Sequence, residues 1–319
     1  MKFFLIFLSI LFTVNINANN DYIEKLCGLT NPECILNALM TKLDKDLEKY
    51  KSDDLIIAED YMNIADLIHD RMSFDDKEMA ESALNYYFKA VKIQEKIYGK
   101  IHCKTSNTYG DIGSSYYRLN RYEEALIFYF KALKTDLNLI DKYGRGQGSY
   151  YSDIASAYKE LKQNNHALTY YLKAVEYEKK QLCTSVDSLY RLYGEIARIY
   201  RKQKKYDKAI DFYKKASVLV SVSRNPNSAK DYNYELSSVY KTQKKYNEAI
   251  IYFLKYMKLD FVDYTFYSFD DLAELYYKNQ QFKESLLWYE YAIKEFEKRG
   301  LIPDKKTKER IIELKKKIK

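Results

Sequence analysis

The chain has 319 residues and a formal net charge of +8, but much of the positive charge lies at one end. Residues 304–319 hold eight Lys or Arg and three Asp or Glu, so the rest of the chain carries a net charge of only +3. This distribution excludes the diffuse basic surface of a typical nucleic-acid-binding protein. Only 9 Gly and 3 Pro occur, and we therefore expect few long irregular loops.

The first 18 residues have the pattern of a secretory signal peptide. Met1-Lys2 precedes an apolar run from Phe3 to Val14, and the next residues turn polar and end in the small residue Ala18. The run is shorter than the roughly 20 residues that a membrane-spanning helix needs. We expect residues 1–18 to be removed and the mature chain to be exported, whether secreted, periplasmic or in the ER lumen. An uncleaved anchor is the alternative.

Residues 19–57 show a helical pattern that differs from the pattern of the rest of the chain. An apolar stripe at helical spacing is formed by Ile35, Leu36, Leu39, Met40 and Leu43. We expect this segment to be a helical cap, because the exposed end of a stack of repeated units must be covered.

Two of the four cysteines lie in this cap, at Cys27 and Cys34. On one continuous helix their α-carbons would be about 10 Å apart, too far for a disulfide. Gly28 and Asn31-Pro32 allow a turn that would bring them together, so a disulfide and two free thiols both remain open. Cys103 and Cys183 lie in separate linkers, and we expect them to be unpaired.

From residue 58 to residue 300 the sequence repeats a unit with an alanine followed four residues later by an aromatic residue. The first four of these alanines are 42 residues apart, and the next two steps are 40 and 36 residues. The positions are Ala83, Ala125, Ala167, Ala209, Ala249 and Ser285, where serine replaces alanine. A regular period of this length indicates stacked supersecondary units, that is, a solenoid. We therefore expect six units.

Each unit has the pattern of two helices joined by a short turn. In the second unit, Tyr109, Ile112, Gly113 and Tyr116 lie on one helical face, and Tyr122, Ala125, Leu126, Tyr129 and Ala132 lie on another. The first helix of every unit has a small residue where we expect the second helix to cross it closely. This small position holds Ala65, Gly113, Ala155, Ala197, Ser237 and Ala273, and three residues later the units carry Ile68, Tyr116, Tyr158, Tyr200, Tyr240 and Tyr276.

This pattern resembles the tetratricopeptide repeat, and its longer spacing with Lys-Ala in the second helix is similar to kinesin light chains. The resemblance covers most of the mature chain. It implies an all-α solenoid of about six helical hairpins that forms a right-handed superhelix, with helical caps at both ends. It also implies a concave groove, lined by the first helices, that holds a peptide or a segment of a partner protein.

The groove-facing positions include a row of acids two residues before the small position. The row consists of Asp111, Asp153, Glu195, Glu235 and Asp271. We interpret these residues as a peptide-binding site for a protein or peptide partner with basic residues. The alternative is that acids near helix starts only stabilise the helix dipole, or that Lys159, Arg198, Arg201 and Lys241 neutralise them.

Residues 301–319 are predicted to form a basic C-terminal capping helix. Ile311, Leu314 and Ile318 share one face of this helix, and lysines cover the opposite side. We expect the apolar face to cover the last unit. Contact between the basic face and an anionic membrane is the alternative.

The sequence contains no pattern that indicates reaction chemistry. The three histidines, His69, His102 and His166, lie in different units, and no paired Cys-x-x-Cys occurs. No Gly-rich phosphate loop or nucleophile elbow is found. We expect no enzyme activity, no cofactor and no metal. We interpret the chain as an exported interaction scaffold; a soluble peptide receptor, or a structural spacer in a cell-envelope or secretion assembly, are the alternatives.

Overall fold

The computed structural model describes residues 31–71, 77–139, 146–180, 186–220, 227–258 and 267–318. These residues form fourteen α-helices, and no strand occurs among them. The expected all-α class is therefore confirmed. The chain divides between Lys162 and Gln163 into two compact units, each considered by itself below. The signal peptide predicted at residues 1–18 lies outside the described residues.

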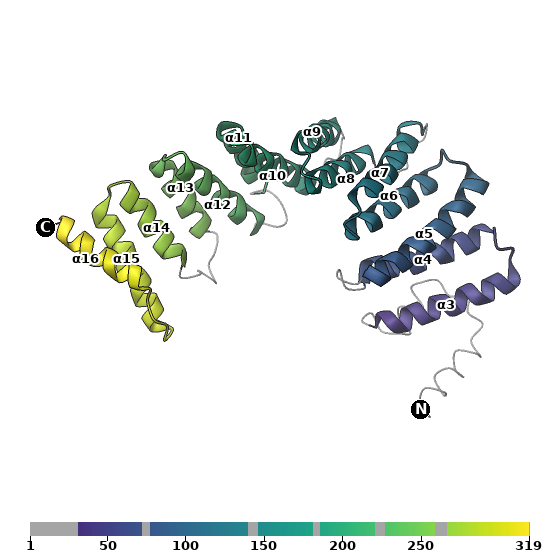
Figure 1. The fold of residues 1–319 in the computed structure, drawn as a ribbon, viewed down its shortest axis with the longest axis horizontal. Coiled ribbons are helices and arrows are strands. Elements are labelled where there is room, and N and C mark those ends of the chain that lie inside the picture. The colour runs from purple at the N-terminus through teal and green to yellow at the C-terminus, as the bar shows by residue number, and fades with distance from the viewer. Residues whose placement is uncertain are drawn as a thin grey trace, which may run out of the picture. The chain divides into compact units, whose positions relative to one another are not determined.

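The described residues of the N-terminal unit form six consecutive helices, which are labelled in Figure 1. Its helices are α3 (Pro32–Lys49), α4 (Leu55–Arg71), α5 (Lys77–Tyr98), α6 (Cys103–Arg118), α7 (Tyr122–Leu137) and α8 (Gln147–Glu160). The pairs α4 with α5 and α6 with α7 pack as hairpins, and α8 packs on α7. The small position identified in the sequence lies on α4, α6 and α8, which are thus the first helices of their repeats.

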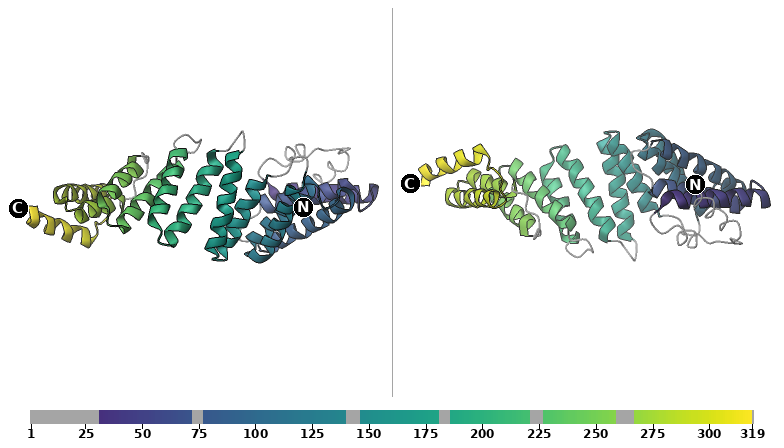
Figure 2. Two further views of the ribbon diagram at one scale, coloured as in Figure 1. Left: turned by 90° about the horizontal axis from the view of Figure 1, so that it is seen from above. Right: turned by 90° about the horizontal axis from the view of Figure 1, so that it is seen from below.

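The described residues of the C-terminal unit form eight helices, and consecutive helices run side by side in the views of Figure 2. They are α9 (Asn164–Lys180), α10 (Val186–Lys202), α11 (Tyr206–Val220), α12 (Asn227–Thr242), α13 (Tyr246–Lys258), α14 (Tyr267–Lys278), α15 (Phe282–Lys298) and α16 (Lys305–Ile318). The hairpins are α10 with α11, α12 with α13 and α14 with α15, while α9 packs on α10.

The two helices of a hairpin cross at the small position, as the sequence predicted. In the second repeat, a Cβ atom placed on Gly113 would lie only 2.6 Å from Cδ1 of Tyr129. Ala65, Ala155, Ala197 and Ala273, which hold the same position in other repeats, are fully buried. The hairpins also use tyrosine as a packing residue: Tyr87, Tyr150, Tyr171 and Tyr213 are each almost completely buried between helices.

The turn between the two helices of a repeat has one recurring backbone feature. The residue seven positions after the small position adopts a left-handed conformation, with φ between 59° and 62°, at Asn120, Lys162, Lys204, Lys244 and Gln280. This conformation lets the next amide turn back, and Lys205 N donates to the carbonyl of Tyr200 at 2.9 Å. The sequence pattern alone did not reveal this feature, because only Asn120 is a residue that favours such a backbone.

Helix α3 packs against α4 at the N-terminal end of the first unit. Asn31 caps it by accepting a hydrogen bond from the Cys34 amide, and Ile35, Leu39 and Leu43 are buried. Met40, which the sequence placed on the same apolar stripe, is instead 42% exposed. Helix α4 begins at Leu55, three residues before the boundary expected at residue 58.

The cysteines are described only in part. Cys34 is disulfide-bonded, and Cys103 is free. Cys27 and Cys183 lie outside the described residues. The Cys27–Cys34 pairing therefore stays a prediction.

Candidate partner-binding face

The five acids predicted as a binding site lie on five successive first helices. Asp111 and Asp153 are on α6 and α8 of the first unit, and Glu195, Glu235 and Asp271 are on α10, α12 and α14 of the second. All five side chains are partly exposed. In each unit, taken by itself, we call the side of the first helices that carries these acids, together with the residues one turn further along, the first-helix face of that unit.

The explanation of these acids by the helix dipole is wrong. The helices begin earlier than the sequence suggested, and α6, α8 and α12 have no acid in their first turn. In α10 and α14 the first-turn acids are Asp187 and Asp270, not the acids of the row. Since the dipole effect fades beyond the first turn, it does not account for the row.

In the second unit, basic side chains pair with each acid of the row. Arg198 donates to Glu195 at 2.5 Å, one turn along the same helix. Between neighbouring helices, Arg201 on α10 pairs with Glu235 on α12, and Lys241 on α12 lies 3.9 Å from Asp271 on α14. The first-helix face of this unit is therefore a row of alternating charges, and the neutralisation considered from the sequence occurs here.

A second feature of this face comes from the second helices, whose tyrosine hydroxyls reach across the hairpin. Tyr87 donates to Asp66 Oδ1 at 2.7 Å, and Tyr289 donates to Glu274 Oε2 at 2.9 Å. The acids stand at the same place in their repeats, directly after the small position. Burial raises the pKa of the Asp66 carboxyl, although the hydrogen bond from Tyr87 opposes this. The sequence could have predicted these contacts, because in both repeats the acid directly follows the small position and the tyrosine lies four residues after the second-helix alanine or serine.

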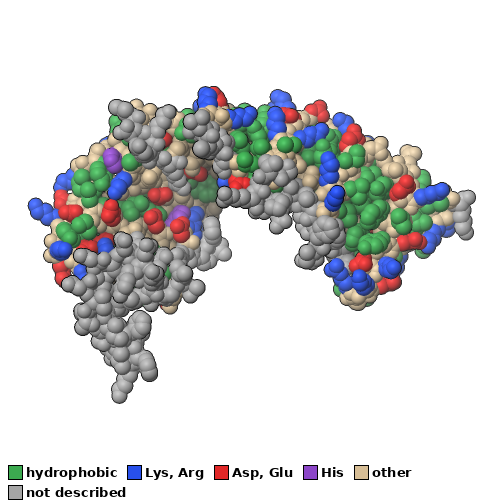
Figure 3. Space-filling model, turned by 180° about the vertical axis from the view of Figure 1, so that it is seen from behind, with side chains coloured by type: hydrophobic (Ala, Val, Ile, Leu, Met, Phe, Trp, Pro, Cys, Tyr) green, Lys and Arg blue, Asp and Glu red, His purple; other side chains and the backbone are tan. Residues whose placement is uncertain are grey.

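The first unit also places a histidine on this face. Nδ1 of His69 lies 3.4 Å from Oγ of Ser115, and its ring meets Tyr87 edge-on at a centroid distance of 6.3 Å. The guanidinium of Arg118 donates to the His69 carbonyl, which ties α6 to α4. Figure 3 shows acidic side chains and a histidine together on the N-terminal part of the molecule.

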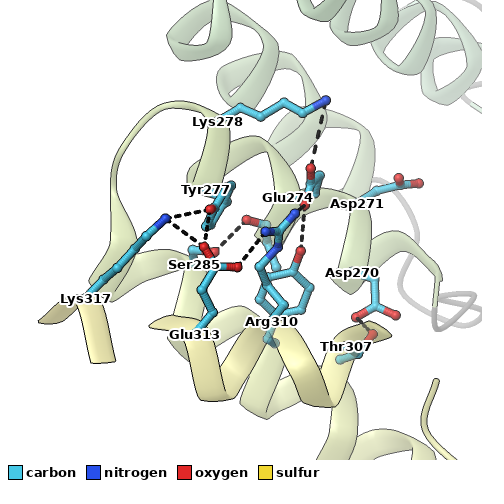
Figure 4. A network of polar contacts seen from close by, with 12 residues as sticks. Asp270, Asp271, Glu274, Tyr277, Lys278, Ser285, Thr307, Arg310, Glu313 and Lys317 are labelled. Atoms are coloured by element: carbon cyan, nitrogen blue, oxygen red, sulfur yellow. Dashed lines mark hydrogen bonds and ion pairs between the residues drawn. The ribbon is translucent and has the colours of Figure 1, made fainter. Parts of the chain in front are cut away.

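Helix α16 packs on the last repeat, beside the end of the row (Figure 4). Arg310 donates to Glu274 at 3.3 Å and to Glu313 at 2.8 Å, and Thr307 donates to Asp270 at 3.2 Å. Hydrogen bonds from Lys317, Tyr277 and Arg310 lower the pKa of Glu313 to about 2. These contacts fix the C-terminal helix on the last repeat through its polar side.

The apolar face of α16 points into the last repeat. Ile311 and Leu314 join Ala273 and Tyr289 in one buried cluster, and Ile318 packs against it. The apolar side of α16 thus packs on the last repeat, as expected for a capping helix. No helix in the described segments has the length and apolar character needed to cross a bilayer.

The described residues offer no centre for metal chemistry. No group of three or more His, Cys, Asp or Glu side chains within them is arranged to hold a metal ion. The groups on the first-helix face are instead suited to recognition, because they present hydrogen-bond donors, acceptors and charges of both signs along neighbouring helices.

Comparison with known families agrees with this architecture. One tetratricopeptide repeat family model matches residues 106–138 and 148–181, and a second matches residues 188–260. Residues 106–138, 148–181 and 188–260 therefore carry tetratricopeptide repeats. No match was found among curated proteins.

Solved structures with the same fold include BtubC and a protein of the kinesin light chain type. BtubC (BKLC) from P. vanneervenii is 16% identical over 76% of this chain and 91% of its own, with a TM-score of 0.55. A Podospora anserina protein of the kinesin light chain type with nearly identical TPR-like repeats is 13% identical over 65% of this chain and 95% of its own, with a TM-score of 0.53.

A third similar structure is the C-terminal part of a TPR repeat-containing protein from Cytophaga hutchinsonii. It is 18% identical over 75% of this chain and 84% of its own, with a TM-score of 0.50. At these identities the likeness concerns the fold alone.

Proposed function

We propose that this protein is an exported scaffold that binds a segment of a partner protein along its first-helix face. Tetratricopeptide repeats bind proteins or peptides, and proteins built from them are in general non-enzymatic scaffolds. The single observation that carries the proposal is the row of acids and cations along α10, α12 and α14. Export rests on the signal-peptide pattern of residues 1–18.

The charge pattern specifies the kind of segment that would fit. Basic side chains of the partner would lie beside Asp111 and Asp153 in the first unit, and beside Glu195, Glu235 and Asp271 in the second. Acidic side chains would lie beside Arg201 and Lys241, which alternate with the acids in the second unit. Because these ion pairs are partly exposed, charged side chains of a partner can replace one member of a pair, and the displaced side chain can remain in contact with water.

The experiment begins with capture of partners by the intact chain in its native cell through proximity labelling. The affinity of a captured partner is then compared for the wild type and for the double variant Asp153→Lys with Glu195→Lys. We expect at least a tenfold loss of affinity and a weaker dependence of binding on salt. A matched control, Glu123→Lys with Glu284→Lys, reverses two exposed acids on second helices and should change affinity less than twofold.

Unchanged affinity of the first double variant would show that the first-helix face does not bind the partner. Copurification of short peptides alone would favour the receptor interpretation. Release of the partner by changes in α3 or α16, with no effect of the first-helix variants, would favour a structural spacer.

A further inference from the structure

A cavity of about 560 Å³ opens between the second helices of the fourth and fifth repeats, on a different face from the row of charges. Its walls are α11 and α13, and its floor is the middle of α12. Lys214, Ser217, Asn233, Tyr252, Lys255 and Lys258 supply its polar lining, while Val218 and Leu236 are apolar. None of these lining residues is acidic. The volume is in the range of pockets that hold small organic ligands.

The first unusual residue in this cavity is Asn233, four positions before the small position. The other five repeats carry an aromatic residue there: Tyr61, Tyr109, Tyr151, Tyr193 and Phe269. In four of these repeats, that ring packs on an aromatic ring of the second helix, with centroids 5.8–6.4 Å apart. The pairs are Tyr61–Tyr86, Tyr109–Phe128, Tyr193–Phe212 and Phe269–Trp288. In the fifth repeat, the second-helix ring is Tyr252, and the side-chain amide of Asn233 stands where the other repeats have the first-helix ring.

The second unusual residue is Lys214, five positions after the second-helix alanine. Every other repeat that is followed by a further repeat has an apolar residue there: Phe88, Phe130, Leu172 and Leu254. Phe88 packs on Tyr116 and Phe128 of the next repeat and so fills the groove between the second helices. Lys214 instead directs its ammonium group to the Tyr240 ring, 5.9 Å from the centroid, and leaves the groove open.

The third unusual residue is Ser217, one turn beyond Lys214. The other repeats carry apolar residues at this place: Val91, Leu133, Val175, Met257 and Ile293. The hydroxyl of Ser217 donates to Oδ1 of Asn233 at 3.4 Å, and Asn233 is 4% exposed. Three polar replacements of apolar repeat positions, from two helices, therefore meet in one cavity.

The chemistry of the cavity combines an aromatic surface with positive charge. Lys255 Nζ lies 4.8 Å from the centroid of the Tyr252 ring, and within the described residues none of the three lysines forms an ion pair. Hydrogen bonding to Tyr240 raises the pKa of Lys214, so its ammonium group stays charged at neutral pH. An anion here would be held by charge-assisted hydrogen bonds, and a planar ring would pack on Tyr252.

We propose that this cavity binds a small aromatic organic anion, with its ring beside Tyr252 and its carboxylate or phosphate at Lys214, Lys255 and Lys258. The ligand ring would take the place that Tyr61, Tyr109, Tyr193 and Phe269 fill in other repeats. This site is independent of partner binding on the first-helix face.

The test uses the purified protein and four probes in calorimetric titration. Indole-3-acetate and adenosine monophosphate represent aromatic carboxylates and aromatic phosphates, while indole and inorganic phosphate each lack one half of the ligand. We expect one of the two aromatic anions to bind at least tenfold more tightly than both incomplete probes. Which one binds identifies the anionic group.

Variants then locate the binding. Asn233→Tyr with Lys214→Leu restores residues that other repeats carry, so the fold should be kept and the cavity filled; we expect binding to fall at least tenfold. Lys255→Leu should also weaken binding, whereas Lys173→Leu, at the same place in the third repeat, should leave it unchanged.

The proposal would be overturned if indole or inorganic phosphate bound as tightly as the aromatic anions. It would also be overturned if the variant Asn233→Tyr with Lys214→Leu bound them as tightly as the wild type. Binding of a phosphotyrosine peptide when neither free aromatic anion binds would overturn it as well, since the site would then recognise a polypeptide.

Discussion

Arg310 on α16 stacks on Tyr277 of α14, with its guanidinium carbon 3.9 Å from the centroid of the ring. In the two preceding repeats, the residue at the place of Tyr277 forms an ion pair with the next first helix: Arg201 pairs with Glu235, and Lys241 with Asp271. Helix α16 thus lies where the first helix of a further repeat would lie. Ile311 takes the buried apolar place held by Leu272 in the last repeat, and Arg310 takes the place of the acids.

Removal of Arg310 should loosen the C-terminal helix. Arg310→Ala deletes the stacking on Tyr277 and the bonds to Glu274 and Glu313. We expect the free energy of local opening of α16 to fall by about 1–2 kcal/mol. Hydrogen exchange of the α16 amides measures this, and Lys305→Ala, whose side chain is 89% exposed, is the control. Equal exchange in both variants would show that Arg310 does not hold the helix.

The close helix crossing at Gly113 should not tolerate even a methyl group. Gly113→Ala puts a Cβ atom 2.6 Å from the Tyr129 ring, so the hairpin must shift. We expect the free energy of unfolding to fall by about 1–3 kcal/mol, which outweighs the helix preference of alanine. In the background Tyr129→Leu the same change should be neutral or stabilising. Urea denaturation measures both free energies of unfolding. If Gly113→Ala lowered them equally in the wild type and in Tyr129→Leu, the contact with Tyr129 would not be the cause of the loss.

The left-handed turns offer sites where glycine should stabilise. Lys204 has φ of 59°, a conformation that is unfavourable for residues with a side chain. We expect Lys204→Gly to raise the free energy of unfolding by about 0.5–1 kcal/mol. Lys294→Gly, at an exposed place inside α15, should instead lower it by about 1 kcal/mol. Thermal denaturation distinguishes the two signs, and a decrease for Lys204→Gly would rule out relief of backbone strain.

The buried carboxyl of Asp60 should give the contact between α3 and α4 a pH dependence. Asp60 is 1% exposed, it pairs with Lys42, and its Oδ2 has no hydrogen-bond partner. Burial raises the pKa of Asp60 to about 6, against the opposing effect of Lys42. Because this pKa lies above the unfolded value of about 3.9, the native state binds more protons, and the contribution of Asp60 to stability falls as pH rises from about 4 to about 6.

Asp60→Asn removes this titration. Relative to the wild type, the variant should gain up to about 3 kcal/mol in free energy of unfolding between pH 4 and pH 7. Asp53→Asn, at an exposed ion pair with Lys96, controls for loss of a carboxylate. Denaturation curves at several pH values provide the measurement. A constant difference between Asp60→Asn and wild type across this range would contradict the raised pKa.

The sequence by itself determined the helical hairpins and the residues at which their helices cross. These features depend on contacts within one helix or between consecutive helices, and a period of 3.6 residues together with a small residue at the crossing encodes both. Ala65, Gly113 and their equivalents could therefore be assigned from the repeat pattern alone. The acids were placed too close to the helix starts; for α8, the residue at the N-cap is Gly146, which has no side chain to mark the start.

Only the tertiary structure decided which charges and which polar residues meet. Arg201 pairs with Glu235 because of the stagger between α10 and α12, a relation across 34 residues that no local pattern specifies. Lys214, Ser217 and Asn233 are single departures from separate repeat positions, and only the packing of α11 on α12 brings them to one cavity. Side-chain pairing between helices depends on their rotation and offset, which are set by the fit of the whole interface and not by the residues of either helix alone.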